Sequence, residues 1–128
     1  MNDIIADLIA RINNGIRAKR LDVLVLKSNY SVRFLEVLEA EGFIRGYKFD
    51  IKTPNHLVVL LKYTENEPVI KKLKKISTKG RRIYTSVNTL WRLNHGWGTF
   101  IISTTEGLLT DEEAREYCLG GEIIAYIE

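Results

Sequence analysis

The chain has 128 residues and a mass of 14.7 kDa, so it holds one compact domain or two very small ones, and a large multidomain enzyme is excluded. Hydrophobic residues make up 45% of it and charged residues 27%, which is typical of a globular chain rather than a disordered one. The apolar stretch 57–61 is far shorter than the ~18 residues that a membrane-spanning helix needs. A single cysteine, Cys118, excludes an internal disulfide framework and an all-cysteine metal site, and favours a reducing compartment.

The net charge of +3 conceals an asymmetry along the chain. Residues 68–105 contain eight basic residues and no acid, whereas residues 106–128 contain seven acids and Arg115 as the one basic residue. This division predicts a basic face that binds a polyanion beside an acidic face that does not. The alternative is that the lysines merely solvate an exposed strand or helix.

The first half of the chain is predicted to fold as α-β-α-β-β. Apolar residues recur at helical spacing from Ile4 to Ile12, and Asn13-Asn14-Gly15 is expected to end or bend that helix. Because Asp3 and Asp7 lie in its first turns, the segment is interpreted as a folded helix and not as a transit peptide. The elements expected next are a buried strand over 21–26, a helix capped near Ser28 to Ser31 and stopped by Gly42, and a hairpin of strands over 44–53 and 56–63.

The polar stretch 64–68 is the candidate boundary between two domains, 1–65 and 66–128. The second half is expected to be mostly β, and the chain as a whole α+β. Thr110 and Glu113 form a capping box that predicts one short helix running to about Cys118. Residues 87–93 are ambiguous and could form one helical turn. The strands expected here cover 69–76, 81–84, 99–103 and 122–127.

Catalytic chemistry finds little support in the residues. Ser103, His95 and Asp111 could be drawn as a triad, but no nucleophile motif surrounds them, and a chain of this size offers such triples by chance. Two histidines and one cysteine share no metal-ligand spacing. Cys118 is expected to be a small core or half-buried residue. We therefore predict no enzyme, no cofactor, no metal, no small-molecule substrate and no membrane contact.

The segment 103–107 is different, because three consecutive hydroxyl residues leave a strand before a glycine. Hydroxyls and loop N–H groups can bond to phosphates, ribose 2′-OH groups or base edges. The alternative is an ordinary Ser/Thr turn. Glu122 follows Gly120-Gly121, and a carboxylate held at a strand start can accept from a cytosine amino group or a 2′-OH, although this segment too could be only a turn.

Six strings occur in order over nearly the whole chain, and each alone is unspecific. They are Arg11-Ile12-Asn13-Asn14-Gly15, Glu41-Gly42-Phe43-Ile44, Gly80-Arg81-Arg82-Ile83-Tyr84, Gly98 to Gly107, Thr110-Asp111-Glu112-Glu113-Ala114-Arg115 and Gly120-Gly121-Glu122-Ile123. Together with the matching length, they resemble the family of the eighth small-subunit ribosomal protein of bacterial and organellar ribosomes. The resemblance implies two small α/β domains, direct binding to small-subunit ribosomal RNA, neighbouring ribosomal proteins as partners, and a role in assembling the central domain of that subunit.

The resemblance also implies roles for individual residues. The family's hydroxyl loop matches Ser103, Thr104, Thr105 and Gly107, which implies RNA contact. Tyr84 and Glu122 match an aromatic residue and an acid with further contacts, and Arg11 and Asn14 match the N-terminal motif. To these the charge pattern itself adds the basic residues Lys74, Lys75, Arg81 and Arg82.

Two departures from the family pattern stand out. Glu106 lies where the family often has Lys or a neutral polar residue, so a charge-assisted phosphate contact is not expected there. Residues 90–97 contain Trp91 and Trp97, where bacterial members tend to have smaller residues. With the modest net charge, this favours a mitochondrial member in the matrix, ahead of a bacterial cytoplasmic or plastid stromal one.

Three functions follow from the sequence in order of preference. The first is a structural RNA-binding protein of the small ribosomal subunit. The second is a non-ribosomal adaptor whose lysine-rich face binds an acidic protein partner. The third is a small hydrolase that uses Ser103 or Cys118.

Overall fold

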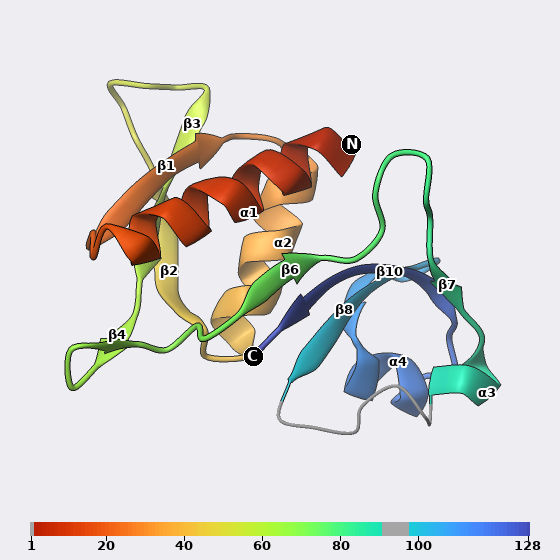
Figure 1. Ribbon diagram of the computed structural model, residues 1–128. Coiled ribbons are helices and arrows are strands. Elements are labelled where there is room, and N and C mark those ends of the chain that lie inside the picture. Colours follow the sequence, from red (N-terminus) through yellow and green to blue (C-terminus); the bar gives the residue numbers. More distant parts are fainter. Residues whose placement is uncertain (1, 91–97) are drawn as a thin grey trace. The chain divides into compact units, whose positions relative to one another are not determined.

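The computed structural model describes residues 2–90 and 98–128 (Figure 1). The chain divides into two compact units, Asp3–Lys71 and Lys72–Glu128. Both units combine helices with a sheet, which confirms the α+β fold class. In the described part of the chain, no helix has the length and apolar character needed to span a membrane.

The first unit has the predicted order α-β-α-β-β, followed by a small hairpin that the sequence did not predict. This hairpin spans residues 63–68, across the predicted domain boundary at 65/66, which stays a prediction. The elements are α1 (Asn2–Arg17), β1 (Asp22–Leu26), α2 (Asn29–Ala40), β2 (Ile44–Phe49), β3 (His56–Leu61), β4 (Tyr63–Thr64) and β5 (Glu67–Pro68).

Helix α1 does not end at Asn13-Asn14-Gly15, which was one of the two predicted outcomes there, but continues to Arg17. A tertiary contact explains why a glycine lies inside this helix. A Cβ atom on Gly15 would overlap Cγ1 of Val23 on β1. The glycine thus lets the helix approach the sheet closely, and this packing outweighs its poor helix propensity. The apolar face of α1 is buried as expected, at Ile5, Leu8, Ile9 and Ile12.

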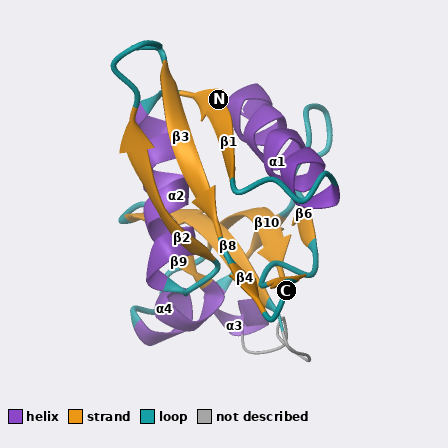
Figure 2. Ribbon diagram, turned by 90° about the vertical axis from the view of Figure 1, so that its left-hand side faces the viewer, coloured by secondary structure: helices purple, strands orange, loops and turns teal. Residues whose placement is uncertain are grey.

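The sheet of the first unit has the strand order β1-β3-β2, all antiparallel, with α1 and α2 on one side (Figure 2). The prediction that β1 is a fully buried strand was wrong. Val23 and Val25 are buried, but Leu24 and Leu26 keep 41% and 39% of their surface exposed. An antiparallel sheet covered on one face buries only alternate residues of each strand. Helix α2 begins at the predicted cap, where Ser28 and Ser31 form a capping box.

The second unit is a sheet built around its last strand. The strand order is β6-β10-β8-β9, and β7 also pairs with β10. The elements are β6 (Leu73–Lys75), β7 (Tyr84–Thr85), α3 (Val87–Leu90), β8 (Thr99–Thr104), β9 (Gly107–Thr110), α4 (Asp111–Glu116) and β10 (Gly121–Ile127). Strand β9 was not predicted, and α3 falls in the segment that the sequence left ambiguous.

Two predicted strands are much shorter in the structure. The strand expected over 69–76 is reduced to β6, and the one expected over 81–84 begins only at Tyr84. Between them, Thr78 and Arg81 exchange backbone hydrogen bonds of 3.0 Å and close a turn at Lys79-Gly80. We call residues 78–82 the basic turn. Its closure takes these residues out of the main sheet.

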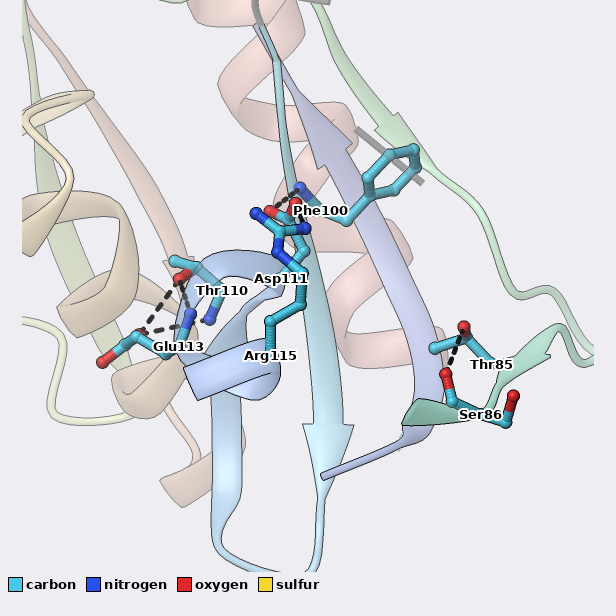
Figure 3. Close-up of polar contacts among 7 residues, drawn as sticks. All are labelled: Thr85, Ser86, Phe100, Thr110, Asp111, Glu113 and Arg115. Atoms are coloured by element: carbon cyan, nitrogen blue, oxygen red, sulfur yellow. Dashed lines mark hydrogen bonds and ion pairs between the residues drawn. The ribbon is translucent and has the colours of Figure 1, made fainter. Parts of the chain in front are cut away.

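The capping box that begins α4 is confirmed. The Thr110 hydroxyl accepts from Glu113 N at 3.1 Å, and the Glu113 carboxylate accepts from Thr110 N at 3.2 Å (Figure 3). Asp111, only 1% exposed, accepts from Phe100 N at 3.2 Å and pairs with Arg115 at 2.8 Å. These contacts fix α4 to β8.

The predicted environment of Cys118 was wrong. Helix α4 ends at Glu116, and Cys118 is exposed with φ +56°, in the left-handed conformation that follows a helix end. The predictions for Trp91, Arg92, His95 and Trp97 lie outside the described residues.

Candidate RNA interface

The start of β10 brings three of the predicted site residues into one row. Glu122 is the register partner of Tyr84 on β7 and of Ser103 on β8. Residues paired across antiparallel strands project from the same face of the sheet. Tyr84 is 69% exposed, and Ser103 is half-buried. An aromatic ring, a carboxylate and a hydroxyl therefore lie side by side, although each is far from the others in sequence. We call these three residues the Glu122 row.

The two glycines before Glu122 make this row possible. A Cβ atom on Gly121 would overlap the backbone oxygen of Ser103, and one on Gly120 would lie 2.6 Å from the backbone oxygen of Thr85. No side chain larger than hydrogen fits between these strands without moving the backbone. Gly120-Gly121 is therefore more than a turn between α4 and β10.

The hydroxyl segment 103–107 is the end of the hairpin β8–β9, with Thr104 paired to Gly107 and Thr105-Glu106 as the turn. The Thr104 hydroxyl donates to Gly107 O at 2.9 Å and accepts from Glu106 N at 3.1 Å. It therefore stabilises the turn. Within the described residues, the hydroxyls of Ser103 and Thr105 make no such bond, and Thr105 is exposed.

The basic turn lies beside the Glu122 row. Arg82 Nη1 is 3.2 Å from Glu122 Oε2, with the two side chains 44% and 17% exposed. Arg81 and Lys79 are exposed on the same turn. The structure thus places basic groups next to the carboxylate, and this part of the site combines charge with fixed polar groups.

Lys74 and Lys75 lie at the other end of β10, opposite Tyr126 and Ala125. At about 3.3 Å per residue, this is roughly 10–13 Å along the strand from Glu122. Lys74 is exposed, whereas Lys75 is half-buried and donates to the backbone oxygen of Ser77. Burial raises the pKa of Tyr126, as does the hydrogen bond that its hydroxyl donates to Glu128.

Arg11 and Asn14 belong to the first unit. Arg11 pairs with Asp7 at 2.8 Å and donates to Leu24 O at 3.3 Å, and Asn14 Oδ1 accepts from Arg17. The two residues line a surface depression with Arg20. They form a polar group on the surface of the first unit, whereas the Glu122 row belongs to the second unit.

Of the triad that could be drawn on paper, Ser103 and Asp111 lie in the described part of the chain, and His95 lies outside it. Both carboxylate oxygens of Asp111 have structural partners, Oδ1 with Phe100 N and Oδ2 with Arg115. No cluster of three or more potential metal ligands occurs among residues 2–90 and 98–128.

The family model for ribosomal protein S8 matches residues 3–127. The chain belongs to the ribosomal protein S8 family. Curated relatives match over nearly the full length of both chains. The small ribosomal subunit protein uS8 of Wigglesworthia glossinidia brevipalpis is 44% identical over 100% of this chain and 98% of its own, and that of Acholeplasma laidlawii is 41% identical over 99% and 98%. The protein uS8c of Chlorella vulgaris is 38% identical over 99% of both chains.

Membership in the S8 family confirms the resemblance read from the six strings. The relatives are named as ribosomal proteins, and none of these comparisons supports the non-ribosomal adaptor or the hydrolase.

One residue that organises the site was missed at the sequence level. Ser77 is buried, and its hydroxyl accepts from Ile83 N at 2.9 Å and donates to Ile83 O at 3.2 Å. These two bonds close the base of the basic turn. No local pattern marks a serine that bonds six residues away, although a lone serine between a lysine-rich strand and a Lys-Gly turn is a weak signal.

Proposed function

We propose that this S8-family chain is a structural, non-catalytic protein of the small ribosomal subunit that binds small-subunit ribosomal RNA directly and helps assemble its central domain. The observation that carries the proposal is the match to the S8 family over residues 3–127. The Glu122 row and the adjacent basic turn supply chemistry that suits this role.

The second unit is the proposed RNA-binding part. Double-stranded RNA presents a wide, shallow minor groove with 2′-OH groups, which short hydroxyl side chains such as Ser103 and Thr105 can reach. Tyr84 offers an exposed ring on which a base can stack. Arg81, Arg82 and Lys74 supply charge for phosphates.

The other predicted site residues take supporting roles in this proposal. Thr104 and Gly107 shape the hairpin turn that presents Thr105. Lys75 contributes charge while it holds the Ser77 backbone. Arg11 and Asn14 form a secondary RNA contact on the first unit. We retain the division into a domain 1–65 and an RNA-binding domain 66–128, which fragments with these bounds would test.

We further propose a mitochondrial matrix location, which rests on Trp91, Trp97 and the modest net charge of +3. Neighbouring small-subunit ribosomal proteins are the proposed protein partners. Immunolocalisation in the source cells would decide between the matrix, a plastid stroma and a bacterial cytoplasm.

The test of the main proposal is sedimentation of the tagged chain with small ribosomal subunits at high salt. We expect it to remain with the subunit after a wash that removes loosely bound basic proteins. In a second assay, the purified chain should bind ribosomal RNA more tightly than duplex DNA of equal length. Release at high salt together with equal affinity for RNA and DNA would contradict the proposal.

A further inference from the structure

An ion pair between Arg82 and Glu122 links the basic turn to the Glu122 row. Arg82 Nη1 lies 3.2 Å from Glu122 Oε2. The carboxylate is held at the start of β10 between Tyr84 and Ser103, and it is the more buried partner, at 17% exposed against 44% for Arg82.

A carboxylate in this position poses an electrostatic problem for an RNA-binding surface. Phosphates repel a negative charge, and the repulsion is larger at a partly buried site than in bulk water. A guanidinium in contact with the carboxylate offsets that repulsion. Its planar set of donors also restricts the orientation of the carboxylate more than a flexible ammonium group would.

The pair leaves Glu122 able to recognise RNA. A carboxylate has about four acceptor sites, and the contact with Arg82 occupies one of them. The groups of RNA that can bond to the remaining sites are donors, namely 2′-hydroxyls and the exocyclic amines of bases.

We infer that Arg82 is a positioning residue, which holds and charge-compensates the Glu122 carboxylate so that it accepts a hydrogen bond from a hydroxyl or amino donor of the RNA. The inference rests on the proposed function. It assigns Arg82 to specificity, and it separates Arg82 from Arg81, the exposed neighbour on the same turn. If Arg82 were only one more cation, its loss would weaken binding to every RNA alike.

The experiment compares two transcripts, the small-subunit ribosomal RNA of Acholeplasma laidlawii, the source of a 41% identical relative, and a shuffled RNA of the same length and composition. The discrimination ratio is the Kd for the shuffled RNA divided by the Kd for the ribosomal RNA. The full-length variants are Arg82→Gln, Arg82→Lys, Glu122→Gln and the double variant Arg82→Gln/Glu122→Gln. Arg81→Gln is the matched control, because it removes the same charge from the same turn.

We expect Arg82→Gln and Glu122→Gln each to lower the discrimination ratio about tenfold, the loss typical of a hydrogen bond to a charged group. The double variant should also lose about tenfold, and not a hundredfold, because both changes disable one contact. Arg82→Lys should keep the affinity for shuffled RNA but lose part of the ratio. Arg81→Gln should weaken both complexes equally and leave the ratio unchanged.

The inference is overturned if Arg82→Gln and Arg82→Lys keep the wild-type ratio, or if the two single losses multiply in the double variant. Thermal melts verify that each variant is folded, and if Arg82→Gln fails to fold, Arg82→Lys decides. A wild-type chain that binds both transcripts equally would instead contradict the proposed function, and the inference with it.

Discussion

The two ends of β10 present different chemistry, although both belong to the same sheet. At Glu122, neighbouring strands place a ring, a carboxylate and a hydroxyl side by side, held by glycines and by the pair with Arg82. At Tyr126, the neighbour on β6 is Lys74, an exposed side chain on a short edge strand. The Glu122 end has fixed polar groups that can form hydrogen bonds with an RNA of matching shape. The Tyr126 end has an exposed charge that attracts any polyanion. Residues of one basic run therefore lie in different surroundings, since Arg82 pairs with a carboxylate and Lys74 is exposed at a sheet edge.

The largest loss of stability should come from a substitution at Gly121, where the strands approach closely at the Glu122 end of β10. A Cβ atom in Gly121→Ala would overlap Ser103 O, so a backbone must shift. We expect the free energy of unfolding to fall by about 3 kcal/mol, and discrimination between RNAs to be lost. Gly80→Ala is the control, because no atom lies within 4 Å of its Cβ position and its φ of +89° costs only about 1 kcal/mol. Denaturant unfolding of both variants measures the difference, and equal losses would contradict this account of the row.

The next effect concerns the hydroxyls at the Glu122 end. Replacing Ser103 and Thr105 together by Ala should cost about 1–3 kcal/mol of binding to ribosomal RNA, because a polar group of the RNA is left without a partner in a dry contact. Binding to shuffled RNA should not change. Equal losses on both RNAs would mean that the segment is only a turn. Thr104→Ala should instead lower stability by about 1 kcal/mol, since its hydroxyl bonds inside the hairpin.

Ser77 tests whether the basic turn must be held in place. Ser77→Ala removes both hydrogen bonds to Ile83 and leaves buried backbone groups without that partner. We expect the free energy of unfolding to fall by about 1–2 kcal/mol. Hydrogen exchange at the Ile83 amide should also become faster in the variant, and unchanged protection there would show that the hydroxyl does not hold the turn.

The smallest effect on RNA binding is expected at the Tyr126 end of β10. Lys74→Ala should weaken binding to all RNAs alike by a few-fold at moderate salt, because it removes one phosphate contact without a change in shape. Lys75→Ala should also disturb the turn, since that side chain holds Ser77 O. Binding curves on ribosomal and shuffled RNA check both, and a loss confined to ribosomal RNA in Lys74→Ala would reverse the roles of the two ends.

The sequence predicted the local elements well because capping and periodicity are local signals. The capping box of α4, the cap near Ser28 that begins α2, the strand 122–127 and the order of the first unit follow from such patterns. Prediction from the sequence failed where a contact with a residue distant in the chain determines the local structure. Helix α1 continues through Gly15, which packs closely on Val23 of β1. The eight-residue strand predicted over 69–76 is reduced to the three residues of β6, because Val69 N bonds to Lys62 O before it and Ser77 bonds to Ile83 after it.

Only part of the candidate site could be predicted from the sequence, for the same reason. Its residues were found from the family resemblance and the charge pattern, but neither reveals that Tyr84, Glu122 and Ser103 are register partners. Strand pairing depends on which strands share a sheet, which no spacing in the sequence gives. The pair between Arg82 and Glu122 follows from the same arrangement.

A salt titration of binding to ribosomal RNA tests the division between the two ends of β10 most directly. If about five basic residues contact phosphates, the wild-type plot of log K against log salt should have a slope of very roughly −4. Lys74→Ala should flatten it by about one unit, whereas the Ser103→Ala/Thr105→Ala variant should keep the slope and bind more weakly at every salt concentration, because neutral hydroxyls release no counterions. A flattened slope in the hydroxyl variant, or an unchanged slope in Lys74→Ala, would contradict the account.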